Sequence, residues 1–300
     1  MTRSLSCCVT WVETTDRMHI IRSIEEMQRE ANSHRAAGAV IGFVPTMGFL
    51  HEGHLDLLRL ARRRSDVTVC SIFVNPTQFG EGEDLARYPR DFDRDCRLLE
   101  AVGCDIVFAP GVEEMYPEGD TTWVQVEGLT NVLEGAFRPT HFRGVTTVVA
   151  KLFHAVRPHL AAFGQKDAQQ VAVIRRMTRD LRFGVEIAVA PIRREKDGLA
   201  MSSRNTYLDK DERKEALALY RSLQTAQRLF SGGERRPEFI QRVVEEEILR
   251  SGAMKLDYTA VVHPDSMQPY EGAIDGPALV AVAARIGSTR LIDNTVLGEE

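Results

Sequence analysis

Two histidines, His51 and His54, stand three residues apart behind a turn that contains Pro45 and Gly48. The apolar run 39–44 before the turn predicts a buried strand, and the leucine-rich segment after it predicts a helix. A strand, a glycine-containing loop and a helix N-terminus together present backbone N–H groups and a positive dipole end to an anion. Because residues three apart share one side of a helical turn, the sequence predicts that both imidazoles face a phosphate group.

The histidine pair could also bind zinc or have a purely structural place in the fold. Zinc enzymes with the His-Glu-x-x-His pattern place two ligands four residues apart around a general base. This sequence reads His51-Glu52-Gly53-His54, so the spacing argues against zinc. The pair could be one core and one surface histidine, but its place at a helix start favours the phosphate interpretation.

Three more loops carry polar side chains suited to a nucleotide or a hydroxy acid. Gly164, Lys166 and Asp167 follow a predicted strand and could contact a nucleotide backbone, a phosphate and a ribose hydroxyl respectively. Taken alone, an ordinary strand-to-helix turn with a solvated lysine and Asp167 as N-cap is the better explanation of these residues. Gln78 and Gln170 are neutral donors and acceptors of the kind that fit a hydroxy acid. The segment 201–205 combines two serine hydroxyls with a guanidinium, which together bind anions.

The elements that must position these loops alternate along residues 18–191. Strands are predicted at 39–44, 66–74, 105–109, 123–126, 159–163 and 185–190. Helices are predicted at 23–37, from about 55, at 91–102, at 145–156 and at 168–179. This rhythm predicts βαβ units and a parallel sheet, in which the carboxyl ends of the strands line the ligand crevice.

The pattern changes after Pro191. The charged turn 193–198 is a candidate hinge. Long helices from Asp209 to residue 230 and from Pro237 to residue 250 precede strands at 256–262, 278–284 and 290–293. Helices and strands no longer alternate one for one, so a smaller α+β domain is predicted at 192–300. Residues 1–17 lack periodicity and are predicted to be a poorly ordered extension.

Bulk composition restricts the class of protein. A net charge of −5 gives no reason to expect nucleic-acid binding. The 5 cysteines lack paired zinc spacings and favour a reducing, cytoplasmic setting over a disulfide framework. No apolar run approaches the length of a membrane span, and residues 1–17 show no signal-peptide pattern.

Five motifs in order resemble those of the pantoate–β-alanine ligase (pantothenate synthetase) family. They are PTMGFLHEGHL (45–55), FVNPTQF (73–79), RPTHFRGV (138–145), FGQKDAQQ (163–170) and DGLAMSSRN (197–205). The resemblance extends from about Met18 to near the end of the chain. It implies a Rossmann-like domain with a doubly wound parallel sheet, spanning residues 18–191, and a smaller C-terminal domain, residues 192–300, that closes over an ATP site.

The resemblance also implies a reaction. Pantoate attacks the α-phosphorus of ATP, which is bound with Mg²⁺, and the resulting pantoyl adenylate is then attacked by the amine of β-alanine, which releases AMP. A homodimer, small-molecule substrates and no protein metal ligands are expected. The alternatives are a nucleotidyltransferase that stops after nucleotide transfer, a non-catalytic nucleotide-binding module and, least favoured, a metallohydrolase.

Residue roles follow from matching positions. The implied catalytic residues are His51, His54, Lys166, Ser202, Ser203 and Arg204, which also contact the nucleotide phosphates; His54 is the implied proton donor. Further nucleotide contacts are implied for Met47, Gly48, Gly164, Gln165, Asp167, Arg193 and Met201. Pantoate and β-alanine contacts are implied for Pro45, Thr46, Asn75, Gln78, Arg138, His141 and Gln170. The sequence departs from the family pattern at Phe49, Thr77, Gln165 and Arg193, where valine is usual at the last position.

Overall fold

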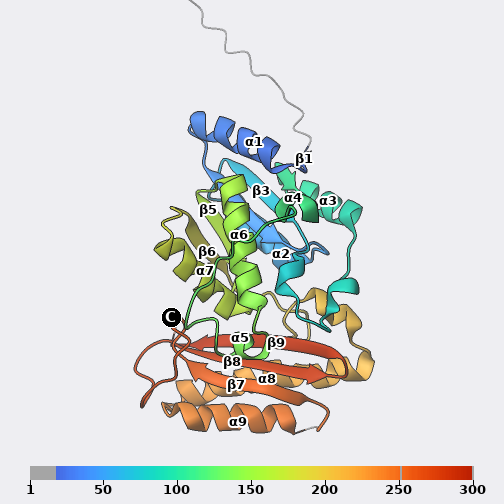
Figure 1. Ribbon diagram of the computed structural model, residues 1–300. Coiled ribbons are helices and arrows are strands. Elements are labelled where there is room, and N and C mark those ends of the chain that lie inside the picture. Colours follow the sequence, from blue (N-terminus) through green and yellow to red (C-terminus); the bar gives the residue numbers. More distant parts are fainter. Residues whose placement is uncertain (1–17, 251, 299–300) are drawn as a thin grey trace, which may run out of the picture.

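The computed structural model describes residues 18–250 and 252–298, which Figure 1 shows as two stacked parts. Within these residues, one part contains a six-stranded parallel sheet and the other a three-stranded antiparallel sheet. The predicted fold class, a doubly wound α/β domain followed by smaller α+β structure, is therefore confirmed. The predicted extension at 1–17 lies outside the described residues, and the boundary at residue 191 stays a prediction.

The strands of the parallel sheet lie in the order β1-β4-β3-β2-β5-β6. Their bounds are β1 (His19–Ile21), β2 (Ile41–Thr46), β3 (Val67–Ile72), β4 (Ile106–Phe108), β5 (Leu160–Gly164) and β6 (Glu186–Ala190). Chain order reverses between β2 and β5, where Phe43 lies in register with Ala161. In an open parallel sheet such a reversal opens a crevice at the carboxyl ends of the two strands. The predicted phosphate and nucleotide loops follow these two strands.

Helices cover both faces of the parallel sheet because successive strand residues point to opposite sides. In β2, Phe43 belongs to the hydrophobic cluster that contains α1 (Ile24–Ala36), α6 (His141–Val156) and α7 (Ala168–Asp180). The next residue, Val44, belongs to the cluster that contains α2 (Glu52–Arg62) and α3 (Phe92–Ala101). Both residues are fully buried. The doubly wound arrangement therefore follows from a strand that is apolar on both faces.

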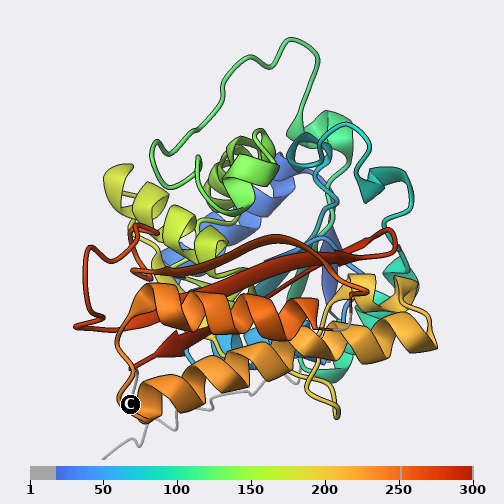
Figure 2. The ribbon, with the colours of Figure 1, turned by 90° about the horizontal axis from the view of Figure 1, so that it is seen from below.

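The antiparallel sheet consists of β7 (Lys255–Val262), β8 (Ala278–Ile286) and β9 (Thr289–Leu297). One face packs against α8 (Lys210–Ser231) and α9 (Pro237–Leu249), which lie side by side across it in Figure 2. The other face contributes Leu279 and Ala281 to the hydrophobic cluster of the parallel sheet. The two sheets therefore share apolar contacts on the side where the parallel strands end.

Local capping explains where two of the predicted helices begin. The Ser23 side chain accepts a hydrogen bond from the Glu26 N–H and starts α1. Asp209 accepts from the Asp211 and Glu212 N–H groups, and the Glu212 carboxylate accepts from the Asp209 N–H in return, which starts α8. Both caps are visible as sequence patterns, and both helix starts are confirmed.

One predicted strand is wrong. Residues 123–126 are irregular, because the Val124 backbone bonds to threonine side chains of α6 instead of to a neighbouring strand: its N–H donates to Thr147 Oγ1 and its carbonyl accepts from Thr146 Oγ1. The sequence pattern also does not predict β1 and several short helices. These are α4 (Val112–Met115), α5 (Glu134–Phe137) and the 3-10 turns η1 (Pro76–Gln78), η2 (Asp84–Ala86), η3 (Gln165–Asp167) and η4 (Ser203–Tyr207).

Candidate active site

A cavity of about 530 Å³ lies where the parallel strands end, between their loops and β9. All four of the loops that the sequence singles out line it. Eighteen of the predicted site residues are among the lining residues: Pro45, Thr46, Met47, His51, His54, Asn75, Gln78, Arg138, His141, Gly164, Lys166, Asp167, Gln170, Arg193, Met201, Ser202, Ser203 and Arg204. The topology therefore brings together side chains that are up to about 160 residues apart in sequence.

Two predicted site residues, Gly48 and Gln165, are not among the lining residues. Gly48 has a φ of +80° and donates its N–H to Thr46 Oγ1 at 3.2 Å, so it shapes the turn after β2. Gln165 faces β9: its Nε2 donates to Asn294 Oδ1 at 3.3 Å, and its carbonyl accepts from Asn294 Nδ2 at 3.0 Å. These positions support the loops that bear the site.

The turn between β2 and α2 is fixed by Asp95 of α3, which no sequence motif marks. The buried Asp95 carboxylate accepts N–H bonds from Phe49 at 2.6 Å and from Leu50 at 2.7 Å. Phe49 has a φ of +50°, a left-handed conformation that is unusual for a residue with a side chain. Burial raises the pKa of Asp95, although these two N–H bonds act in the opposite direction.

The two histidine rings lie beside each other at the start of α2, with centroids 4.0 Å apart and planes tilted by 31°. The His51 N–H donates to His54 Nδ1 at 3.3 Å, which leaves the proton of a neutral His54 on Nε2. Within the described part of the chain, His51 Nδ1 is buried without a hydrogen-bonding partner. A buried polar atom without a partner is rare in native proteins, and at this helix start it is available to an external ligand.

Both histidines are uncharged at neutral pH. Burial, and next the positive charge of Lys166, lower the pKa of His51 to about 4. Burial and the neighbouring His51 hold the pKa of His54 well below its ordinary value. Each imidazole can therefore offer an anion a neutral N–H donor, but not the second ring proton of an imidazolium.

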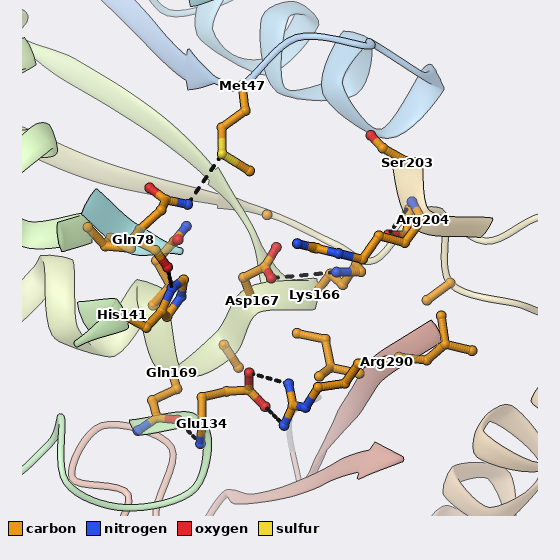
Figure 3. A pocket seen from close by; sticks show the side chains of 18 of the residues that line it. Met47, Gln78, Glu134, His141, Lys166, Asp167, Gln169, Ser203, Arg204 and Arg290 are labelled. Atoms are coloured by element: carbon orange, nitrogen blue, oxygen red, sulfur yellow. Dashed lines mark hydrogen bonds and ion pairs between the residues drawn. The ribbon is translucent and has the colours of Figure 1, made fainter. Parts of the chain in front are cut away.

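Lys166 and Asp167 face the cavity from η3. Lys166 Nζ lies 3.5 Å from Asp167 Oδ1, a loose ion pair that leaves further donors of the ammonium group available. Asp167 makes no side-chain capping bond to α7. Figure 3 shows Lys166, Asp167 and Arg204 directed toward the same space. Asp167 therefore occupies the N-cap position of α7 without capping it through its side chain, which leaves the carboxylate available to a ligand.

The serine–arginine segment approaches from the other side of the cavity. Ser203 Oγ lies 3.3 Å from the Phe49 carbonyl, to which it donates, and Ser202 Oγ accepts from the Arg204 N–H at 3.2 Å. Arg193, next to this segment, is half exposed and lies 3.5 Å from Asp56 Oδ2. The Arg193 carbonyl accepts from the Met201 N–H at 2.9 Å. The segment is thus already seated on the turn that precedes the histidines.

Neutral amides line the opposite end of the cavity. Asn75 Nδ2 donates to Gln78 Oε1 and to the Gly144 carbonyl, both at 3.1 Å. Gln78 Nε2 donates to Met47 Sδ at 3.3 Å, as drawn in Figure 3. A Cβ at Gly144 would lie 2.5 Å from the Thr77 carbonyl, so this close approach requires glycine. The backbone contact holds Gln78 against the start of α6.

Arg138 and His141 act on Gln78 through its backbone. Burial, and next the charge of Arg138, lower the pKa of His141 to about 4. The neutral ring donates from Nδ1 to the Gln78 carbonyl at 3.0 Å and accepts at Nε2 from Arg138 at 3.2 Å. Arg138 also donates to the Gln78 carbonyl at 3.3 Å. Both residues line the cavity, and both also fix the position of Gln78.

Charged residues outside every predicted motif form a buried cluster below the amides. Arg290 of β9 donates to both Glu134 oxygens, at 2.6 and 2.8 Å, and to Asp257 Oδ2 at 2.7 Å. Tyr258 donates to Glu134 Oε1 at 2.9 Å. Figure 3 shows Glu134 and Arg290 facing each other across the cavity floor. The cluster joins α5 to the antiparallel sheet, and no local sequence pattern marks it.

Neither a metal cluster nor a membrane helix is found among the residues that the structure describes. In these ranges, no group of three or more His, Cys, Asp or Glu side chains is arranged to hold a metal ion. Over the same ranges, none of the helices combines the length and the apolar character needed to cross a bilayer.

The neutral histidines predict a pH-dependent stability. An unfolded histidine binds a proton near its ordinary pKa of 6.5, whereas folded His51 and His141 bind one only near 4. Between these values the unfolded chain binds more protons, so the free energy of unfolding should fall as the pH drops from about 6.5 toward 4. Urea unfolding at a series of pH values measures this slope. The variant His141→Gln should reduce the slope, and a slope equal to that of the unaltered protein would contradict the assignment.

Comparisons with known proteins agree on one family. Residues 19–296 match the family described as Pantoate-beta-alanine ligase. The chain is 56% identical over 281 residues to the pantothenate synthetase of Thermotoga neapolitana, covering 94% of this chain and 100% of that one. It is 53% identical over 280 residues to that of Acetivibrio thermocellus, covering 93% and 99%.

Solved structures agree with the sequence relatives. The pantothenate synthetase of Thermus thermophilus matches with a TM-score of 0.86 at 49% identity, covering 93% of this chain and 99% of that one. The pantoate-beta-alanine ligase of Francisella tularensis, complexed with beta-gamma ATP and beta-alanine, matches with a TM-score of 0.77 at 33% identity, covering 93% and 98%.

Proposed function

The chain belongs to the pantoate–β-alanine ligase family, and we propose that it condenses (R)-pantoate with β-alanine in a reaction driven by MgATP. The products are pantothenate, a coenzyme A precursor, with AMP and pyrophosphate. One observation carries the proposal: a single cavity offers cations and an unpartnered buried imidazole at one end and neutral amides at the other. The first end suits a triphosphate and the second a hydroxy acid.

In the first step, a pantoate carboxylate oxygen attacks the α-phosphorus of ATP. The new P–O bond forms as the bond from the α-phosphorus to the bridging oxygen breaks, and pyrophosphate leaves with that electron pair. The protein's task is to hold the two reactants in line and to stabilise charge on the phosphate oxygens. We assign this task to His51, His54, Lys166, Ser202, Ser203 and Arg204.

The remaining nucleotide contacts are assigned by position. Met47, Gly164, Asp167, Arg193 and Met201 line the same cavity and are proposed to bind the nucleotide directly. Gly48 and Gln165 are proposed to contribute through the shape of their loops. Mg²⁺ enters as part of the substrate, bound to the ATP phosphates.

In the second step, the β-alanine amine attacks the acyl carbon of pantoyl adenylate. The C–N bond forms, the bond from the acyl carbon to the phosphate oxygen breaks, and AMP leaves; the attacking amine loses a proton to become an amide. Pro45, Thr46, Asn75, Gln78 and Gln170 are proposed to bind pantoate and β-alanine. Arg138 and His141 are proposed to support them through the Gln78 backbone.

Assembly and location remain part of the proposal. We propose a homodimer in a reducing cytoplasm, on the basis of the family resemblance and the unpaired cysteine spacings. The C-terminal part, residues 192–300, is proposed to close over ATP through the segment 201–205.

The test is release of AMP from ATP and pantoate, measured with and without β-alanine. Pantothenate and AMP should appear in equal amounts only when all three substrates are present. Pyrophosphate release from ATP and pantoate that does not respond to β-alanine, with neither free AMP nor pantothenate, would instead support the nucleotidyltransferase alternative.

A further inference from the structure

Two adjacent carboxylates, Glu83 and Asp84, bind two of the arginines that line the cavity, Arg138 and Arg204. We propose that this carboxylate pair is a positioning device: it fixes Arg204 at the phosphate end of the cavity and Arg138 at the acceptor end. Neither carboxylate binds substrate itself. The inference rests on the proposed function, because it assigns Arg204 to the phosphate end and Arg138 to the acceptor end.

Each carboxylate grips one edge of a guanidinium. Glu83 accepts from Arg138 Nε at 2.7 Å and from Arg138 NH2 at 2.6 Å. Asp84 accepts from Arg204 Nε and NH2, both at 2.9 Å. Two hydrogen bonds between the same carboxylate and guanidinium fix the plane of the guanidinium as well as its distance from the carboxylate. The four side chains are between 12% and 28% exposed, so these pairs are shielded from solvent far more than surface ion pairs.

The charge state agrees with this arrangement. Burial acts to raise the pKa of Glu83, but the hydrogen bond and charge of Arg138 outweigh it and lower the pKa overall. The same balance, with Arg204 as the partner, lowers the pKa of Asp84. Both carboxylates are therefore ionised at neutral pH and neutralise the arginines that they hold.

Arg204 keeps one edge for a ligand. Its NH1 makes no hydrogen bond to any residue that the structure describes, whereas Nε and NH2 are committed to Asp84. Arg138 has less left to offer: its Nε and NH2 contact Glu83 and the Gln78 carbonyl, and NH1 contacts His141. Asp84 thus leaves Arg204 NH1 as a donor for the phosphate end of the cavity. Glu83 holds Arg138 where it donates to the Gln78 carbonyl at the other end.

The loop that contains Glu83 and Asp84 also contacts η4 directly. The Tyr207 hydroxyl donates to the Arg87 carbonyl at 3.2 Å, and the Arg87 guanidinium lies 5.7 Å from the Tyr207 ring. Arg204 lies 5.8 Å from the ring of Tyr88. Because Glu83 and Asp84 are neighbours, a displacement of either arginine is transmitted to the other through one peptide unit.

The test compares Asp84→Asn and Glu83→Gln with Glu81→Gln. Glu81 lies on the same loop, also lines the cavity, is exposed and makes no ion pair to the described residues, so it controls for the loss of one negative charge beside the cavity without the loss of a bound arginine. Removing a negative charge next to an anion site should by itself strengthen anion binding. Losing the two hydrogen bonds from the guanidinium to the carboxylate should instead misplace the guanidinium. Asp84→Asn should therefore lower kcat about 10- to 100-fold with no increase in KM for ATP. Glu83→Gln should lower kcat about 10-fold, and Glu81→Gln should match the unaltered protein.

Three results would overturn the inference while leaving the function intact. They are kcat values for both variants equal to that of the Glu81→Gln control, an Asp84→Asn effect confined to a raised KM for ATP, or full activity in Asp84→Ala. Failure of the unaltered protein to make pantothenate would refute the function itself. Thermal unfolding of each variant checks that the fold is retained. Asp84→Glu keeps the negative charge on a side chain that is one methylene longer, and its kcat should lie between those of Asp84→Asn and the unaltered protein.

Discussion

Replacing His54 by alanine is expected to lower the rate of pantoyl adenylate formation about 10²- to 10³-fold, the usual effect of removing one preorganised donor. The variant loses the Nε2–H of the neutral His54 imidazole, which is proposed to donate to the phosphate. The bond from the His51 N–H to His54 Nδ1 fixes the tautomer that carries this proton. Single-turnover measurement with ATP and pantoate, without β-alanine, isolates this step. The fold should persist, because alanine removes only one acceptor at the start of α2.

Two further variants separate the donor from the capping function of His54. His54→Gln can place an N–H near the position of Nε2, whereas His54→Asn can replace only the Nδ1 acceptor for the His51 N–H. The expected order of rates is unaltered protein, then His54→Gln, then His54→Asn and His54→Ala together. A His54→Asn variant as fast as His54→Gln would show that the helix cap, not donation to phosphate, is what matters.

Replacing Arg290 by methionine is expected to lower the free energy of unfolding by about 3–5 kcal/mol, since it leaves the buried Glu134 carboxylate without its cationic partner. The Glu134 side chain is 9% exposed and that of Asp257 is 8% exposed. Burial acts to raise the pKa of Glu134, but the bonds and charge of Arg290 lower it overall, so it is ionised at neutral pH. Urea unfolding at pH 7 measures the loss.

Arg285 supplies a matched control for this prediction. It lies on β8 next to β9, reaches the same Asp257 at 3.5 Å and is 46% exposed. Arg285→Met should change the unfolding free energy by less than about 1 kcal/mol, because the Arg285 guanidinium is half exposed and Asp257 keeps its closer bond to Arg290. Equal losses in the two variants would mean that the buried cluster contributes nothing beyond a surface ion pair.

The parallel sheet and its ligand edge could be predicted because their signals are local. A strand that is apolar at every position, such as β2, must be covered on both faces, and its carboxyl end must then carry a loop at the crevice. Ser23 and Asp209 mark helix starts because capping requires a side-chain acceptor at one position. The histidine pair is informative because it occurs where strand, turn and helix meet.

The remaining features depend on contacts between distant residues. Glu134 and Arg290 are 156 residues apart, and nothing near either predicts that they are buried together. Glu83 and Asp84 belong to a polar stretch that is typical of a solvated loop, yet each faces an arginine. The predicted strand at 123–126 is wrong for the same reason: its hydrogen-bonding partners are Thr146 and Thr147 of a helix. The neutral state of His51 likewise depends on burial within the assembled fold.

The most direct test of the proposed reaction is to follow the carboxylate oxygen of pantoate that attacks the α-phosphorus. Pantoate labelled with ¹⁸O in both carboxylate positions should transfer one ¹⁸O to AMP, because the attacking oxygen stays on the α-phosphorus when the amine displaces AMP. Mass spectrometry of the AMP from a complete reaction measures the transfer. AMP carrying one ¹⁸O is the predicted result, and unlabelled AMP formed alongside pantothenate would contradict a pantoyl adenylate intermediate.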